Sequence, residues 1–369
     1  MTINNEHKKL NVPNLRFPEF QGEWEKKRLE ECVEFLDGLR KPIKSEDRKS
    51  EQGLYPYYGA SGIIDYIDGY IFDGEYILLS EDGANIIDRN YRVAFIAKGK
   101  IWVNNHAHVL QPYDGFDINF LSETLERLNY AVYNTGTTMP KLNQEVCRNI
   151  NLKIPTTKEQ NKIGNLLSLL NKRIATQNKI IDKLQSLIKG IRNDVFGKLR
   201  KSVGFNAMIS DVLSYEQPQP YIVENTEYTA EGTPVLTANK AFVLGYTSET
   251  NGIYDKGDCI IFDDFTLDCK YVDFPYKIKS SAIKILTAKN KEILRYTFEF
   301  LKYLDLSTDE HKRHYIAEMQ NQEFVLPTMQ IVRTIAHAFS ALSLRMESVV
   351  KQRNMFETQK QYLLRQMFI

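Results

Sequence analysis

The feature that most constrains this chain of 369 residues is a long segment that occurs twice. The first copy, IPTTKEQNKIGNLLSLLNKRI, begins at Ile154, and the second, LPTMQIVRTIAHAFSALSLRM, begins at Leu326. The two align without a gap at an offset of 172 residues. Because a chain of this length exceeds one typical domain core, the duplication predicts that a domain and the segment after it are each repeated.

Both copies carry apolar residues at alternating steps of three and four, which is the heptad spacing of a helix that packs on another helix. Polar residues interrupt the two seams at Gln177, Arg353 and Lys360. Each helix would run for ~40 residues, or ~60 Å. We expect an antiparallel pair within the chain; the alternatives are a helix that lies on its own domain core and a homodimeric coil. The seam residues are Ile163, Leu167, Leu170, Ile174, Ile181 and Leu184 in the first copy, and Phe339, Leu342, Met346, Val349, Phe356 and Leu363 in the second.

A helix start signal also recurs. Pro-Thr precedes each seam, at Pro155 and at Pro327, and a threonine at this place can accept from the exposed amides of the first turn. Gln160 stands three residues after Thr157, which is the spacing of a capping box, whereas the second copy has Ile331-Val332 where the first has Glu159-Gln160 and lacks it.

Short strand-like runs broken by Gly and Asp fill the segments between the helices, as in EYILLSEDG, YRVAFIAKGKIWV and GDCIIFDDF. WEKKRLEECVEF, which begins at Trp24, also loosely matches FNAMISDVLSY, which begins at Phe205. The fold class predicted is therefore α+β, with two mixed α/β domains, two long helices and a pseudo-twofold repeat. The expected segments are residues 1–153, 154–201, 202–325 and 326–369, in the order domain, helix, domain, helix.

Charge is distributed unevenly although the net charge is only +1. Residues 158–201 contain 11 Lys and Arg against 3 Asp and Glu, whereas residues 202–327 contain 12 against 19. The helices are thus basic and the domains mildly acidic, so composition alone does not predict nonspecific affinity for nucleic acid. We find no run of 18 apolar residues and no C-x-x-C pair among the four cysteines, so we expect a cytoplasmic protein without a membrane span, zinc ribbon or redox motif.

Several blocks, taken in order with the duplication, resemble the specificity subunit of a type I restriction-modification system. In the first half they are NVPNLRFPEFQGEWEKKRL, YYGASGIIDYIDGYIFDGEYILLSEDGAN, WVNNHAHVL and NINLKIPTTKEQNKI. In the second half they are GTPVLTANK, GDCIIFDDFTLDCKYVDFPYKIKSSAIKIL and HKRHY. The resemblance covers nearly the whole chain.

This resemblance implies two target-recognition domains that each read half of a bipartite double-stranded DNA site. It implies that the two helices act as a ruler and as docking surfaces for two modification (methyltransferase) subunits and, through them, for restriction/translocase subunits. Methylation of adenine and DNA cleavage would then be directed by a noncatalytic chain. Neither G-x-x-x-x-G-K-[ST] nor N-P-P-Y occurs in the sequence, so we expect no cofactor here, with S-adenosylmethionine, ATP and Mg on the partner subunits. Residues 36–140 and 216–312 barely align, which predicts an asymmetric target.

Candidate DNA-binding residues follow from side-chain chemistry within the matching blocks. Asparagine can bond adenine through two contacts, glycines permit close approach of the backbone to phosphate, and lysine and arginine neutralise phosphates. A loop, a turn or a solvated charge cluster would explain the same residues. The candidates are Tyr58, Gly59, Ser61, Asn104, Asn105, His106, Asn239, Lys240, Lys312, Arg313 and His314.

Two other classes of function stay open. Asp264, Asp268 and Lys270 have the composition of a metal-dependent nuclease site, in which two carboxylates hold the metal and a lysine meets the phosphate. A structural coiled-coil adaptor would use the helices alone, but it does not require two large inserted domains. His106 and His108 could form half a metal site on one strand, although we expect strand-end polar residues and no bound metal.

Overall fold

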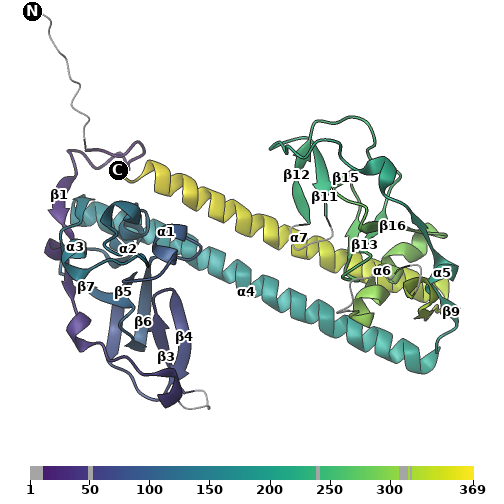
Figure 1. Ribbon diagram of the computed structural model, residues 1–369, viewed down its shortest axis with the longest axis horizontal. Helices are drawn as coiled ribbons and strands as arrows, with labels where there is room; N and C mark the ends of the chain where they lie inside the picture. Colours follow the sequence, from purple (N-terminus) through teal and green to yellow (C-terminus); the bar gives the residue numbers. More distant parts are fainter. Residues whose placement is uncertain (1–10, 49–52, 238–241, 307–314, 316–317) are drawn as a thin grey trace, which may run out of the picture. The chain divides into compact units, whose positions relative to one another are not determined.

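The computed structural model describes residues 11–48, 53–237, 242–306, 315 and 318–369, and it divides into two compact units (Figure 1). Unit 1 comprises Met1–Thr176 and Arg353–Ile369, and unit 2 comprises Gln177–Gln352. The long helices α4 (Thr157–Ser202) and α7 (Met329–Gln366) contribute to both units. The division into four segments in chain order stays a prediction.

The helices α4 and α7 run antiparallel in each unit (Figure 1). In unit 1, the guanidinium of Arg173 in α4 lies 5.5 Å from the ring centroid of Phe356 in α7. In unit 2, the guanidinium of Arg192 lies 5.8 Å from the ring centroid of Phe339. Residue numbers therefore rise along α4 as they fall along α7, which confirms the antiparallel pair expected from the sequence.

Each residue of the two predicted seams is buried or half-buried, as the heptad spacing requires. The polar interruption at Lys360 has a partner, because its Nζ donates to the buried carboxylate of Glu123 at 3.1 Å. The cation at this level of the seam thus pairs with an acidic residue of α2 in the domain.

The helix start of α4 differs from the expected capping box. The side chain of Gln160 accepts from the amide of Asp117 at 3.1 Å and donates to the carbonyl oxygen of Pro155 at 3.0 Å. The Thr157 hydroxyl donates to the carbonyl oxygen of Gly115 at 2.8 Å. Tertiary contacts with the loop before α2 therefore take both side chains, and the capping-box prediction was wrong.

Unit 1 is built on a six-stranded sheet in the order β2-β7-β5-β6-β3-β4. Neighbouring strands are antiparallel except for β3 and β6, which are parallel. The sheet strands are β2 (Val33–Phe35), β3 (Tyr55–Gly59), β4 (Gly62–Ile67), β5 (Phe72–Ser80), β6 (Ala94–Val103) and β7 (Ala107–Pro112). The antiparallel pair β1 (Glu25–Arg28) and β8 (Asn151–Ile154), the helices α1 (Asn85–Asp88), α2 (Ile118–Glu126) and α3 (Gln144–Arg148), and the 3-10 helices η1 (Leu29–Glu31), η2 (Asp37–Leu39), η3 (Ser45–Asp47) and η4 (Tyr130–Tyr133) complete it.

Unit 2 has a four-stranded sheet in the order β10-β16-β13-β14 and a three-stranded sheet in the order β12-β11-β15. The strands are β10 (Leu213–Glu216), β11 (Thr233–Leu236), β12 (Val243–Thr247), β13 (Cys259–Asp263), β14 (Cys269–Val272), β15 (Lys277–Ile278) and β16 (Ile283–Ala288). A short pair, β9 (Ala207–Met208) and β17 (Glu323–Phe324), the helices α5 (Ile209–Val212) and α6 (Leu294–Leu304), and the 3-10 helices η5 (Gln219–Tyr221), η6 (Lys291–Ile293) and η7 (Met319–Asn321) complete this unit.

The two units share one topology although their middle segments barely align in sequence. The order β2-β7-β5-β6 in unit 1 corresponds to β10-β16-β13-β14 in unit 2. Each unit also has a hairpin with a bulge, β3-β4 or β11-β12, whose first strand pairs in parallel with a later strand, β6 or β15. In unit 1 the single strand β6 pairs with both β5 and β3, whereas in unit 2 β14 pairs with β13 and β15 pairs with β11. The predicted internal repeat therefore extends through the domains.

The same aromatic and charged contacts tie the helices to both domains. Phe368 stacks on Phe120 of α2 with ring centroids 5.2 Å apart, and Phe196 of α4 contacts Tyr296 of α6 at 5.3 Å. Buried carboxylates lie on the same helices: Glu123 pairs with Arg92 and Lys360, and Glu299 pairs with Arg192 and Arg295. Within the described part of the chain, no helix has the length and hydropathy needed to cross a membrane.

Candidate nucleic-acid interface

The residues predicted to bind DNA in the first half of the chain meet at one end of the unit 1 sheet. Tyr58, Gly59 and Ser61 lie where β3 turns into β4, and Asn104, Asn105 and His106 lie between β6 and β7. The amide of Asn104 donates to the carbonyl oxygen of Tyr58 at 3.0 Å. Two segments far apart in sequence thus form one surface.

These six residues divide into an exposed group and a supporting group. The side chains of Ser61, Asn105 and His106 are exposed. Asn104 is only 5% exposed, and its Oδ1 accepts from the amide of His106 at 2.8 Å, so its carboxamide shapes the turn. Tyr58 is half-buried, and burial raises the pKa of its phenol. Asn105 is therefore the better placed of the two asparagines to meet a base edge.

The segment Ser80–Asp82, at the end of β5, holds both halves of this surface. The Ser80 hydroxyl donates to the carbonyl oxygen of Ala60 in the β3-β4 turn at 2.6 Å. The amide of Glu81 donates to the carbonyl oxygen of His106 at 2.9 Å, and both carboxylate oxygens of Asp82 lie 2.9 Å from Nδ1 of the same histidine. The conformation of Ser80–Asp82 therefore fixes where the exposed residues stand.

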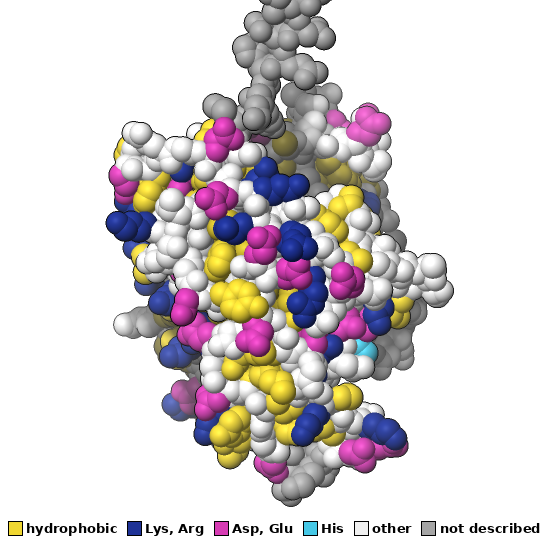
Figure 2. Space-filling view, turned by 90° about the vertical axis from the view of Figure 1, so that its left-hand side faces the viewer, with side chains coloured by type: hydrophobic (Ala, Val, Ile, Leu, Met, Phe, Trp, Pro, Cys, Tyr) yellow, Lys and Arg dark blue, Asp and Glu magenta, His cyan; other side chains and the backbone are white. Residues whose placement is uncertain are grey.

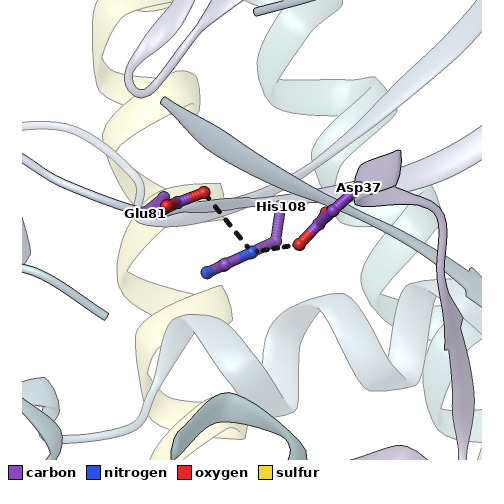
Figure 3. Close-up of side chains that lie close together, drawn as sticks. All are labelled: Asp37, Glu81 and His108. Atoms are coloured by element: carbon purple, nitrogen blue, oxygen red, sulfur yellow. Dashed lines mark hydrogen bonds and ion pairs between the residues drawn. The ribbon is translucent and has the colours of Figure 1, made fainter. Parts of the chain in front are cut away.

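Glu81 of this segment belongs to a polar cluster in which His108 is buried and the two acids are half-buried, and we call Asp37, Glu81 and His108 the unit 1 cluster (Figure 3). Nδ1 of His108 lies 2.6 Å from Oδ2 of Asp37 and 3.7 Å from Oε2 of Glu81. Arg40 donates to Glu81 at 2.7 Å, and its guanidinium lies 3.6 Å from Asp37. Nζ of Lys141, whose side chain is 46% exposed, also lies 3.6 Å from Oε1 of Glu81, so three basic side chains surround the two carboxylates.

Geometry fixes the charge of His108. Nδ1 faces a carboxylate, and Nε2 faces the carbonyl oxygen of Leu142 at 2.8 Å, so both ring nitrogens have acceptors as partners and both must carry hydrogen. Burial acts to lower the pKa of His108, but the bonded Asp37 carboxylate and the neighbouring Cys147 outweigh it and raise the pKa to about 10. The His108 bond in turn lowers the pKa of Asp37 against the effect of burial.

The unit 1 cluster has the composition of a metal site, but its geometry argues against that use. A histidine binds a metal through a neutral ring nitrogen, and a protonated His108 offers none. Arg40 also lies against both carboxylates, where it takes the place that a cation would occupy. We therefore interpret the cluster as a closed ion-pair network.

Unit 2 contains a counterpart at the same positions, and we call Gln217, Asp264 and Lys284 the unit 2 cluster. Strand registers establish the match: His108 faces Leu79 across β7 and β5, and Lys284 faces Phe262 across β16 and β13. Nζ of Lys284 lies 2.8 Å from Oε1 of Gln217 and 3.6 Å from Oδ2 of Asp264. The distances in the two clusters agree to within a few tenths of an ångström.

Asp264 also reaches the segment that holds the second set of predicted DNA-binding residues. Its Oδ1 accepts from the amide of Tyr315 at 2.8 Å. The candidates Lys312, Arg313 and His314, which immediately precede Tyr315, lie outside the described residues, as do Asn239 and Lys240.

The nuclease interpretation of this region is not favoured. Asp264 is 1% exposed and is committed to Lys284 and Tyr315. The carboxylate of Asp268 is held by Lys302 at 2.8 Å and by Lys270 at 2.9 Å. Each acidic group therefore has basic or amide partners, which leaves no pair of carboxylates facing one metal position.

The sequence of this chain was compared with those of known protein families. Residues 21–186 match the family described as type I restriction modification DNA specificity domain. This part of the chain belongs to that family. The specificity domain spans unit 1 up to α4 and extends into the part of α4 that lies in unit 2.

Individual relatives agree with this assignment. The specificity subunit of the type I restriction enzyme EcoR124I/EcoR124II of Escherichia coli is 43% identical over 126 residues, which cover 32% of this chain and 31% of that protein. The specificity subunit of the type I restriction enzyme MjaVIII of Methanocaldococcus jannaschii is 28% identical over 195 residues, which cover 50% of this chain and 44% of that protein. The chain thus matches less than half the length of either relative.

A solved structure extends the similarity in fold to both units. The S subunit of a type I restriction-modification system from M. genitalium matches with a TM-score of 0.75 over 97% of this chain and 99% of that one. Sequence identity is 16%, so this match shows the fold alone.

The surface of the specificity domain does not present one sign of charge. Figure 2 shows acidic and basic side chains intermixed with hydrophobic ones on the face in view. On β4, the side chains of Ile63 and Ile64 are 46% and 53% exposed, and Tyr66 is 37% exposed. A mixed surface of this kind favours particular contacts over general attraction to phosphates.

Sequence reasoning missed the unit 1 cluster and the unit 2 cluster. Asp37, Glu81 and His108 come from three separate segments, and only strand register brings them together. A local sequence signal does exist for the repeat of the domain fold, in α2 and α6. FLSETLERL from Phe120 and YTFEFLKYL from Tyr296 share an aromatic residue, a buried glutamate and two leucines at equal spacing.

Proposed function

We propose that this chain is the DNA-recognition subunit of a type I restriction-modification complex, in which each unit reads one half of a bipartite target. The observation that carries the proposal is the repetition of the specificity-domain topology in unit 2. Two readers with one fold suit the approximate twofold symmetry of duplex DNA, and the distance between readers sets the distance between half-sites. Their loops differ in sequence, so the target is asymmetric.

The partner subunits supply the chemistry in this proposal. Two modification subunits dock on α4 and α7, hold S-adenosylmethionine and methylate adenine, and restriction/translocase subunits join through them with ATP and Mg. Support comes from the exposed faces of α4, where Lys158, Lys172, Lys179 and Lys183 stand outside the seam. A basic face that is not needed for packing is available to an acidic partner surface.

Unit 2 offers a groove that suits part of this role. A hollow of about 520 Å³ between β11, β12 and the segment before β15 is lined by Pro234, Tyr246 and Phe274 together with smaller residues. Apolar side chains of this kind can contact the methyl group of thymine in the major groove.

The deciding experiment is the adenine methylation pattern of the host genome, read by single-molecule sequencing with the gene present and deleted. The proposal expects the loss of one bipartite, asymmetric methylated motif on deletion. An unchanged pattern in a host that expresses the chain and methylates other motifs would overturn it.

The ruler role has its own test, and the antiparallel register sharpens its design. Arg173 lies opposite Phe356, so an insertion after Thr176 in α4 is level with one after Gln352 in α7. One added heptad in each helix preserves the seam and lengthens it by ~10 Å, or about three base pairs. The methylated motif should keep both half-sites with a gap longer by that amount. An unchanged gap in an assembled, active variant would contradict the ruler role.

A further inference from the structure

The two buried clusters repeat an arrangement but not a chemistry. In unit 1, His108 on β7 lies between Asp37, which follows β2, and Glu81, which follows β5. In unit 2, Lys284 on β16 lies in the same way between Gln217, which follows β10, and Asp264, which follows β13. The acceptor is Asp37 in unit 1 and Gln217 in unit 2. A reaction or a metal site would require the same donor atoms in both units, so what the clusters share is a buried cation that holds a carboxylate in place.

The two clusters also differ by a matched pair of charges. Unit 1 uses Asp37 and Arg40 where the equivalent positions of unit 2 are Gln217 and Pro220, so unit 2 lacks one acid and one base together. The cations of both clusters are 1% exposed in their side chains. Burying such a group is unfavourable unless it is paired and hydrogen-bonded, and an apolar residue of similar volume would often stabilise a core at least as well. Retention of a charged centre in both units is therefore explained better by positioning than by stability.

The carboxylate residue of each cluster is bonded to neighbouring segments, which include the turn with His106 in unit 1 and Tyr315 in unit 2. In unit 1, the Glu81 amide donates to the carbonyl oxygen of His106, and the Glu81 carbonyl oxygen accepts from the amide of Leu142. In unit 2, the Asp264 amide donates to the carbonyl oxygen of Ala282, and its side chain accepts from the amide of Tyr315. A change in the backbone at Glu81 would therefore move His106, and a rotation of the Asp264 carboxylate would release the amide of Tyr315.

We infer that His108 and Lys284 are positioning residues for DNA recognition, each of which sets the recognition loops of its own unit through Glu81 or Asp264. This inference rests on the proposed function and deepens it. In this inference neither cation touches DNA. His108 lies against Glu81, whose amide is bonded to His106, and Lys284 lies against Asp264, whose carboxylate is bonded to the amide of Tyr315. Each half-site therefore depends on one buried cation.

The test replaces each cation and asks which half-site changes. The tagged full chain is purified from its host with the subunits that accompany it, and it selects sequences from a pool of random-sequence duplexes. The variants are His108→Gln and Lys284→Gln, which lose the charge and keep a hydrogen-bonding group, and His108→Lys, which keeps the charge balance and places the cation of unit 2 in unit 1. Urea unfolding shows which variants are folded.

The expected results are reciprocal. His108→Gln should lose discrimination at one half-site by about tenfold or more, the range of one good base contact, and leave the other half-site unchanged. Lys284→Gln should do the reverse. His108→Lys should restore the half-site that His108→Gln lost, which a role in packing alone would not produce, because lysine and imidazole differ in shape.

Contrary outcomes separate the two ideas. A wild-type chain that selects a bipartite motif, with folded glutamine variants that select the same motif equally well, would overturn the positioning role and leave the proposed function intact. Loss of the same half-site in both glutamine variants, or a folded His108→Lys variant without restored discrimination, would also overturn it. A wild-type chain that selects no bipartite motif would overturn the proposed function and this inference with it.

Discussion

Replacement of His108 by lysine should remove a specific pH dependence from the stability of unit 1. His108 is surrounded by Asp37, Glu81, Arg40 and Cys147; although burial acts to lower its pKa, the bonded Asp37 and the neighbouring Cys147 raise it to about 10. The pKa of histidine in an unfolded chain is about 6.5. The folded state therefore holds a proton that the unfolded state releases between these two values.

The sign and size of the effect follow from proton linkage. A raised pKa contributes stability that is fully present below pH ~6.5 and is lost as the pH rises toward ~10. Between pH ~6.5 and ~9 the loss is up to about 3 kcal/mol in the free energy of unfolding, at ~1.4 kcal/mol for each unit of pH. A lysine at this position has an unfolded pKa of ~10.4 and stays charged in both states over that range.

Tryptophan fluorescence isolates the effect. The chain has two tryptophans, Trp24 and Trp102, and both lie in unit 1. Urea unfolding followed by their emission therefore reports unit 1 even when unit 2 unfolds separately. Unfolding curves of the wild type and of His108→Lys, taken from pH 6.5 to pH 9, share the titration of every other group, so their difference belongs to position 108.

The wild type should lose more stability than His108→Lys across this range, by about 2–3 kcal/mol. Parallel curves, with a difference below about 1 kcal/mol, would refute the assignment of His108 as a buried imidazolium held by its two acceptors.

Two further predictions concern residues whose roles the structure separates. Asn104→Ala should destabilise unit 1 by about 1–3 kcal/mol in urea unfolding, because it removes a carboxamide that is 5% exposed and leaves the amide of His106 without its acceptor. Asn105→Ala should leave stability within about 0.5 kcal/mol and weaken selection of one half-site. The reverse pattern would contradict the interface. Phe368→Ala should lower the stability of unit 1 by about 3–5 kcal/mol, because the ring is 6% exposed and stacks on Phe120. Tryptophan emission should report this loss, and an unchanged midpoint would show that residues 353–369 do not belong to the core of unit 1.

Much of the fold could be predicted because it depends on local periodicity. The steps of three and four placed the seams of α4 and α7, and the strand-like runs from Glu75 and Gly257 contain most of β5 and all of β13. These features need only the residues within a few turns or one strand. The repeat gave the order of elements in the same way, since its two copies align without a gap.

The site was less predictable because it depends on register and on tertiary contacts. The spacing of Thr157 and Gln160 suggested a capping box, but contacts with Gly115 and Asp117 took both side chains. His108 looked like half of a metal site, and only its second acceptor, the carbonyl oxygen of Leu142, shows that it is protonated. Such partners lie dozens of residues apart, and no local pattern identifies them.

Unit 1 is built from two separate parts of the chain, and this determines the order in which the two units can fold during synthesis. Unit 2 is continuous, from Gln177 to Gln352, so its core can close as soon as its own residues have left the ribosome. Unit 1 contains most of its strands long before then, but Leu364, Met367 and Phe368 belong to its core and are made only after the whole of unit 2. The domain translated first is therefore the last to be completed, and until then its exposed apolar surface is available to chaperones.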